Sequence, residues 1–148
     1  MTQARLNGIE IDCAVSGRGP AVLLTHGYSA TRRMWEGQHR ALEKSYQVIS
    51  WSMRGHGQTE SPADPAKYSA DLTIADMEAL LRHLDVQRAV IGGLSLGGVA
   101  SLGFYLAHPE MTARSSSATR APATGTRRRG RPGTSGRRSA RPSSRRAG

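Results

Sequence analysis

The chain has 148 residues, about the length of one domain. Its single cysteine, Cys13, excludes an internal disulfide and a cysteine-based metal cluster, and is typical of a reducing compartment. No apolar run reaches the roughly 18 residues of a membrane span, and the start lacks the apolar core of a secretory signal. We therefore expect a cytoplasmic protein with no membrane partner.

The net charge of +10 is unevenly distributed along the chain. Residues 1–111 contain ten Arg and Lys and all eleven acidic residues, whereas residues 112–148 contain eleven Arg and no acid. The two segments therefore need separate interpretations.

The first predicted elements are two kinds of strand. Residues 5–15 alternate apolar and polar side chains around Asn7 and Gly8, which is typical of a β-hairpin. The short apolar run 21–25 predicts a strand that is buried on both faces.

The rest of this segment alternates between helix and strand. The predicted elements in chain order are a helix over 34–44, a strand over 46–51, a loop over 54–67, a helix that Asp71 caps, a strand over 89–91 and a helix that ends near His108. In the second helix Ile74, Met77, Leu81 and Leu84 share one apolar face. This order predicts an α/β fold with a mostly parallel sheet and flanking helices.

The segment Gly93-Leu94-Ser95-Leu96-Gly97 carries the candidate chemistry, because a predicted strand precedes it and a predicted helix follows it. A serine on such a tight turn has a strained backbone and projects its hydroxyl from the sheet. The residues two positions away approach closely, so Gly93 and Gly97 leave room where side chains would clash. The new helix also aims free N–H groups at a developing anion.

Three motifs follow one another along the chain: His26-Gly27, Arg54-Gly55-His56-Gly57-Gln58-Thr59 and the segment from Gly93 to Gly97. Together they resemble the N-terminal half of the α/β-hydrolase family. The resemblance covers about residues 5–111 and is strongest to the esterase, enol-lactonase and cofactor-free haloperoxidase branch. It implies a nucleophile at Ser95 and an oxyanion hole formed by the backbone N–H groups of Tyr28 and Leu96. The implied substrate is a small carboxylic ester, thioester or lactone, with neither a metal nor an organic cofactor.

Two residues set this chain apart within the family. The epoxide hydrolase and dehalogenase branches use an aspartate nucleophile, which Ser95 does not match. Ser52 stands where the family loop usually reads Asp-x-Arg-Gly, and we interpret this as a local structural change.

Plainer interpretations remain open. Ser95 is also compatible with an ordinary glycine-rich turn, although its context favours the nucleophile. His26 and His56 are interpreted as loop-packing residues, and His83 and His108 as solvated surface groups. Gly92-Gly93 starts no G-x-G-x-x-G motif, so a dinucleotide site is disfavoured.

Triad partners would follow Ser95 in the order acid, then histidine, and only Glu110 and His108 do so. A helix places His108 roughly 20 Å away from Ser95, far beyond the ~3 Å reach of a general base. The chain therefore contains neither the triad acid nor the triad histidine. We expect it to be inactive and, with strand and helix faces exposed, to aggregate; a sharp two-state melt of a soluble monomer would contradict this.

Residues 112–148 use only Ala, Gly, Pro, Arg, Ser and Thr, which predicts a disordered, low-complexity basic tail. All six have codons with C or G at the second base, as expected when a GC-rich gene is read out of frame. Our hypothesis is a frameshift near Met111, which the intact mass of the native product would test. When the codons of Ser115–Ser117 are read one base earlier, they encode apolar residues of a predicted strand.

The alternative is a degenerate hydrolase half whose arginine-rich arm binds nucleic acid without sequence specificity.

Overall fold

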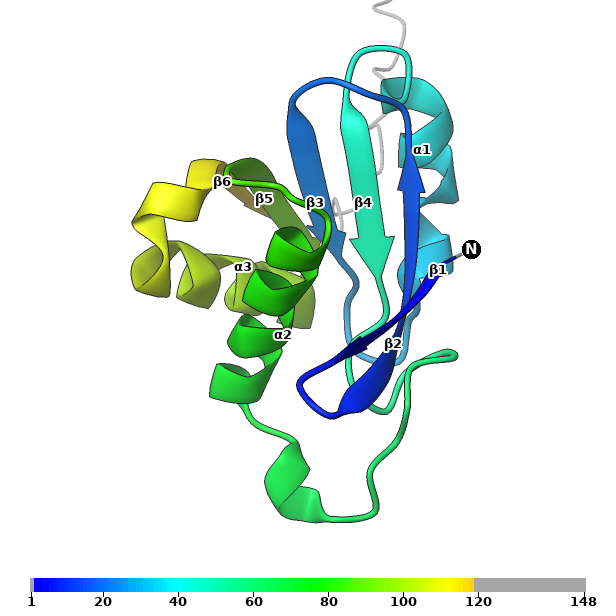
Figure 1. Cartoon of the computed structure of the whole chain (residues 1–148), viewed down its shortest axis with the longest axis vertical. Coiled ribbons are helices and arrows are strands. Elements are labelled where there is room, and N and C mark those ends of the chain that lie inside the picture. Colours follow the sequence, from blue (N-terminus) through cyan, green and yellow to red (C-terminus); the bar gives the residue numbers. More distant parts are fainter. Residues whose placement is uncertain (1, 119–148) are drawn as a thin grey trace, which may run out of the picture.

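The computed structural model describes residues 2–118, and the remainder of the predicted tail lies outside the described residues. The described chain forms one six-stranded mixed sheet flanked by helices (Figure 1). The strands are β1 (Thr2–Leu6), β2 (Ile9–Ser16), β3 (Ala21–Thr25), β4 (Gln47–Trp51), β5 (Ala89–Leu94) and β6 (Thr112–Ala118). The helices are α1 (Glu36–Leu42), α2 (Ala70–His83) and α3 (Leu96–Ala107), with 3-10 turns η1 (Arg32–Trp35), η2 (Pro65–Lys67) and η3 (Pro109–Met111). This is the α/β architecture that the sequence predicted.

The sheet order is β1-β2-β4-β3-β5-β6. The predicted hairpin is confirmed: β1 and β2 pair antiparallel across Asn7 and Gly8, whose φ angles are 48° and 79°. Both residues thus adopt the left-handed conformation that suits a two-residue hairpin turn. Strands β4, β3, β5 and β6 run parallel, so their carboxyl ends share one edge of the sheet.

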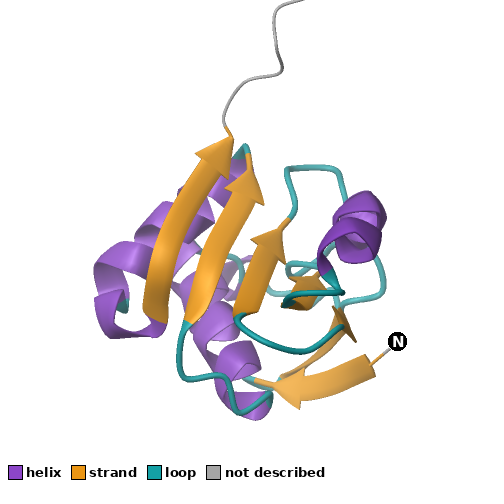
Figure 2. Ribbon diagram, turned by 90° about the horizontal axis from the view of Figure 1, so that it is seen from above, coloured by secondary structure: helices purple, strands orange, loops and turns teal. Residues whose placement is uncertain are grey.

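Helices cover both faces of the sheet (Figure 2). On one face, α2 and α3 pack over the main core, which includes Ile11, Leu23, Ile49, Ile91 and Phe104. On the other face α1 covers a smaller cluster, Val22, Leu24 and Val48, against which Trp35 and Leu42 pack. Successive β3 side chains therefore enter opposite cores, which is why the whole strand is buried.

Two predicted helix starts were wrong. The helix predicted over 34–44 begins earlier as η1, because the Thr31 hydroxyl accepts a hydrogen bond from the Arg33 amide. The second helix is capped by Ser69 rather than by Asp71: the Ser69 hydroxyl accepts from the Leu72 amide at 3.1 Å. Asp71 lies in the first turn, where its negative charge interacts favourably with the positive end of the helix dipole.

The sheet continues beyond the predicted boundary at Met111. Strand β6 pairs parallel with β5, from Ala89 opposite Thr112 to Leu94 opposite Ala118. Backbone pairing with an existing strand does not depend on side-chain hydrophobicity, so a boundary drawn on composition missed it. Among the described helices, none is long and apolar enough to cross a membrane.

Candidate active site

Ser95 occupies the junction between β5 and α3, at the carboxyl edge of the parallel strands. Its backbone has φ 51° and ψ −115°, a conformation that is strained for any residue with a Cβ. Ligands of open α/β sheets bind at this edge. The strained strand-to-helix turn predicted from the sequence is present.

Gly93 and Gly97 allow this turn to close. A Cβ on Gly93 would collide with the carbonyl group of Gly97, and a Cβ on Gly97 would collide with the carbonyl oxygens of Thr25 and His26. The elbow therefore packs backbone against backbone, both within itself and against the end of β3. The predicted lack of room at these two positions is confirmed.

The loop after β3 lies directly against the elbow. A Cβ on Gly27 would lie 3.3 Å from the Leu94 carbonyl oxygen and 3.7 Å from the Ser95 Cβ. Tyr28 follows in this loop, with its side chain 77% exposed, and Leu96 is the first residue of α3. Within residues 2–118 the amides of Tyr28 and Leu96 donate to no other backbone group outside regular elements. Tyr28 thus follows the residue that contacts the elbow, and Leu96 follows Ser95 directly.

His26 is fully buried and connects two loops of the site. Its Nε2 accepts from the Met53 amide at 2.9 Å, so the ring proton is assigned to Nδ1, which donates to the Gly27 carbonyl oxygen at 2.7 Å. Burial lowers the pKa of His26, and the bond to Gly27 only partly opposes that effect. Both ring nitrogens are occupied, so His26 holds the loops in place, as predicted.

His56 packs against both His26 and Tyr28. Its ring centroid lies 4.9 Å from that of His26 and 6.0 Å from that of Tyr28. Its Nδ1 is bonded to the Arg54 carbonyl oxygen at 2.9 Å. These contacts agree with the predicted packing role in the loop after β4.

A buried ion pair anchors the same loop to α2. Arg54 Nε donates to Asp76 Oδ2 at 2.6 Å and Arg54 Nη2 donates to Asp76 Oδ1 at 2.9 Å. Asn7 Nδ2 also donates to Asp76 Oδ1 at 2.9 Å, which adds the hairpin turn to the network. The hydrogen bonds that Arg54 donates to Asp76 raise the pKa of Arg54. The departure at Ser52 is structural, since its buried hydroxyl accepts from the Arg32 amide at 3.2 Å.

His39 and His108 have structural contacts outside the elbow. His39 lies between the hydroxyls of Ser16, at 2.7 Å, and Ser50, at 2.8 Å, and thus ties α1 to the sheet. His108 was predicted to be a solvated surface group, but only 21% of its side chain is exposed. Its ring packs 5.0 Å from that of Phe104, because the helix end folds it back onto the core.

The pH dependence of stability should reflect two imidazoles, that of the buried His26 and that of the partly buried His39. Burial lowers the pKa of His26 and His39, so the unfolded chain takes up protons near pH 6.5 while the folded chain does not. The free energy of unfolding should therefore fall as the pH drops below about 6.5, by up to about 1.4 kcal/mol per pH unit for each histidine. Urea titrations at pH 7, 6 and 5 measure this.

Two variants separate the histidine contribution from that of the carboxylates. His39→Gln should reduce the slope between pH 6.5 and 5, whereas His83→Gln, at an exposed position on α2, should leave it unchanged. Equal slopes in all three proteins would contradict the assignment.

No general base accompanies the serine within the described residues. All five histidines of the sequence lie in this part of the chain, and Ser95 makes no side-chain hydrogen bond as the cap of α3. His108 lies at the far end of the 12-residue α3, about 18 Å along its axis. Glu110, the one acid after Ser95, lies at that same end, 3.7 Å from His108. The described residues contain no group of three or more His, Cys, Asp or Glu that could hold a metal ion.

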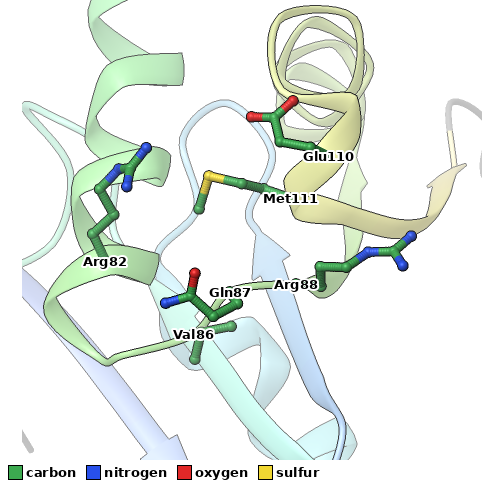
Figure 3. A pocket seen from close by; sticks show the side chains of 6 residues that line it. All are labelled: Arg82, Val86, Gln87, Arg88, Glu110 and Met111. Carbon is green, nitrogen blue, oxygen red and sulfur yellow. The ribbon is translucent and has the colours of Figure 1, made fainter.

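Two cavities open at opposite edges of the sheet. One, of about 400 Å³, includes Tyr28 and Leu96 in its wall and adjoins the elbow. The other, of about 340 Å³, lies between the end of α2 and the segment before β6 (Figure 3). Its Arg88 and Met111 directly precede β5 and β6, so this cavity is at the amino edge of the sheet, away from Ser95.

Comparisons with known proteins agree with this architecture. The model of the alpha/beta hydrolase fold family matches residues 20–125, and the chain therefore belongs to this family. An uncharacterized protein of Mycobacterium tuberculosis is 37% identical over 100 residues, which are 68% of this chain and 29% of that protein. The chain thus spans less than a third of the length of this relative.

Two solved structures show the same relation. An epoxide hydrolase from Vigna radiata has a TM-score of 0.76 and 27% identity, with 78% of this chain and 38% of that one covered. The enol-lactonase from Burkholderia xenovorans LB400 has a TM-score of 0.73 and 29% identity, with 77% of this chain and 45% of that one covered. Both likenesses extend over most of the described residues.

Proposed function

We propose that this chain carries the nucleophile and oxyanion hole of a serine hydrolase that acts on a carboxylic ester, thioester or lactone. The observation that carries the proposal is the left-handed backbone of Ser95 at an elbow with no room for side chains at Gly93 and Gly97. Strained backbone conformations of this kind concentrate at functional sites, which supports a role for Ser95 in contact with a substrate.

In the proposed reaction the Ser95 hydroxyl oxygen attacks the substrate carbonyl carbon, and its proton passes to a base. The amides of Tyr28 and Leu96 stabilise the resulting oxyanion. Collapse of the tetrahedral intermediate expels the alcohol or thiol and leaves an acyl-enzyme on Ser95, which water then hydrolyses. An acid–histidine pair would supply the base, and no histidine of this chain is placed to do so. We therefore propose that the chain by itself is nearly inactive.

The likeness to an epoxide hydrolase offers an alternative substrate class. Opening an epoxide through a covalent intermediate suits a carboxylate nucleophile, whereas an activated hydroxyl suits acyl transfer. Because residue 95 is a serine, carbonyl chemistry is the better supported proposal.

A fluorophosphonate probe tests the nucleophile directly. We expect slow but site-specific labelling of Ser95, on the order of 10⁴–10⁶-fold slower than in an intact triad, because oxyanion stabilisation remains when the base is lost. Mass spectrometry of tryptic peptides identifies the labelled residue. Ser95→Ala should abolish labelling, while the control Ser61→Ala, in the exposed loop after β4, should not change it. Equal labelling of several serines would refute the proposed role.

A further inference from the structure

The cavity beside the elbow has an apolar, continuous wall. It lies between the first half of α2, the α3 helix and the loops that contain Tyr28 and Met53. Its lining residues are Tyr28, Met53, Arg54, His56, Tyr68, Ser69, Ala70, Thr73, Ile74, Leu96, Val99, Ala100 and Gly103. At about 400 Å³ it is within the size range of small-molecule sites. Figure 1 shows that α2 and α3 are neighbours, and residues of both helices line the cavity.

The wall presents no available charge. Arg54 is the one permanently charged residue among those that line the cavity. Its side chain is 5% exposed and donates two hydrogen bonds to Asp76. An anionic group bound among the apolar side chains, away from the Tyr28 and Leu96 amides, would therefore lose its hydration without gaining a partner, which is costly. Met53, Ile74 and Val99 instead favour an apolar group.

The depth of the cavity depends on small residues of α3. Ala100 and Gly103 face α2, and a Cβ on Gly103 would lie 2.8 Å from Ile74 Cδ1. Val99 is 62% exposed and lies at the open side. The cavity is therefore a slot that a slender chain can enter from solvent.

We propose that this cavity binds the uncharged, apolar chain of an ester of medium length. The assignment rests on the proposed function, because Tyr28 and Leu96 belong both to the cavity wall and to the proposed oxyanion hole. A chain seated in the slot would bring its ester carbonyl to the side of the elbow where the two amides are available. The substrate class is thus a neutral alkyl ester rather than a charged or strongly polar one.

Binding measured without catalysis tests this proposal on the full chain. The ¹⁵N-labelled protein is titrated with methyl butyrate, methyl hexanoate and methyl octanoate, and with monomethyl adipate, which has a carboxylate at the far end of a six-carbon chain. We expect amide shifts at Val99, Ala100 and Gly103 and a dissociation constant that falls about fourfold for each added methylene. Monomethyl adipate should bind at least tenfold more weakly than methyl hexanoate, because its carboxylate would lie in the apolar part of the cavity.

A matched pair of variants on α3 provides the control. Val99 and Leu102 are both apolar and more than half exposed, but only Val99 lines the cavity. Val99→Asp should weaken methyl octanoate binding at least tenfold, and Leu102→Asp should leave it unchanged. Equal weakening in both variants, or equal affinity for butyrate and octanoate esters, would overturn the proposal. Labelling of Ser95 is measured separately, so a chain that binds the ester with an unreactive Ser95 would refute the nucleophile and not the cavity.

Discussion

Replacing Gly97 with alanine is expected to destabilise the chain by about 3 kcal/mol or more. The added Cβ meets the carbonyl oxygens of Thr25 and His26, and neither α3 nor β3 can retreat without breaking sheet or helix bonds. Overpacking in a core typically costs 1–3 kcal/mol when side chains can rearrange, and backbone cannot rearrange so readily. The midpoint of urea unfolding, followed by circular dichroism, measures the loss.

Gly37→Ala is the matched control for this variant. Gly37 lies in α1, and a Cβ there would have nothing within 4 Å. Alanine should therefore stabilise the protein by up to about 1 kcal/mol through helix propensity. If both substitutions shifted the midpoint equally, the close packing of the elbow would not be what constrains Gly97.

Replacing Asp76 with asparagine is expected to cost about 3–5 kcal/mol of the free energy of unfolding. The substitution leaves the Arg54 guanidinium buried, charged and without its carboxylate, and that is far costlier than losing both partners. The bond from Asn7 to Asp76 Oδ1 also connects the hairpin turn to α2, so the loss should affect the hairpin as well as the loop after β4. Because domains of this size have about 5–15 kcal/mol in total, the variant should be folded only marginally.

Glu78→Gln, two residues further along the same helix, serves as the control. Glu78 pairs with Arg82 at 2.8 Å across one helical turn, where the Arg82 side chain is 65% exposed. Such surface pairs contribute roughly 0.3–0.5 kcal/mol, so this variant should unfold close to the parent midpoint. A small effect of Asp76→Asn would mean that the Arg54 charge finds another partner or water.

The features that the sequence predicted correctly are those encoded within a few consecutive residues. Asn7-Gly8 defines the hairpin because only a few residue types tolerate its left-handed turn. The Gly93–Gly97 motif similarly predicts the elbow because its spacing reflects contacts within the same turn. Ser69 caps α2, but serine and aspartate are both preferred helix caps, so the sequence alone did not distinguish Ser69 from Asp71.

The features that sequence reasoning missed depend on residues distant in the chain. Asp76 looks like an ordinary polar residue in a helix, and its partners Arg54 and Asn7 are 22 and 69 residues away. The apolar cavity likewise needs Tyr28, Ile74 and Val99 together, from a loop and two helices. Strand β6 was missed for another reason, because its pairing with β5 uses backbone groups and leaves no hydrophobic pattern.

Selection for a stable fold and selection for catalysis favour different residues at position 95, because the backbone there is strained. With φ 51° and ψ −115°, this residue stores on the order of 1–3 kcal/mol that a glycine would largely release. A lineage maintained only for the persistence of its folded chain would gain by exchanging the serine for glycine. A lineage maintained for turnover would accept the weaker fold. The residue type at position 95 therefore distinguishes selection for catalysis from selection for stability alone.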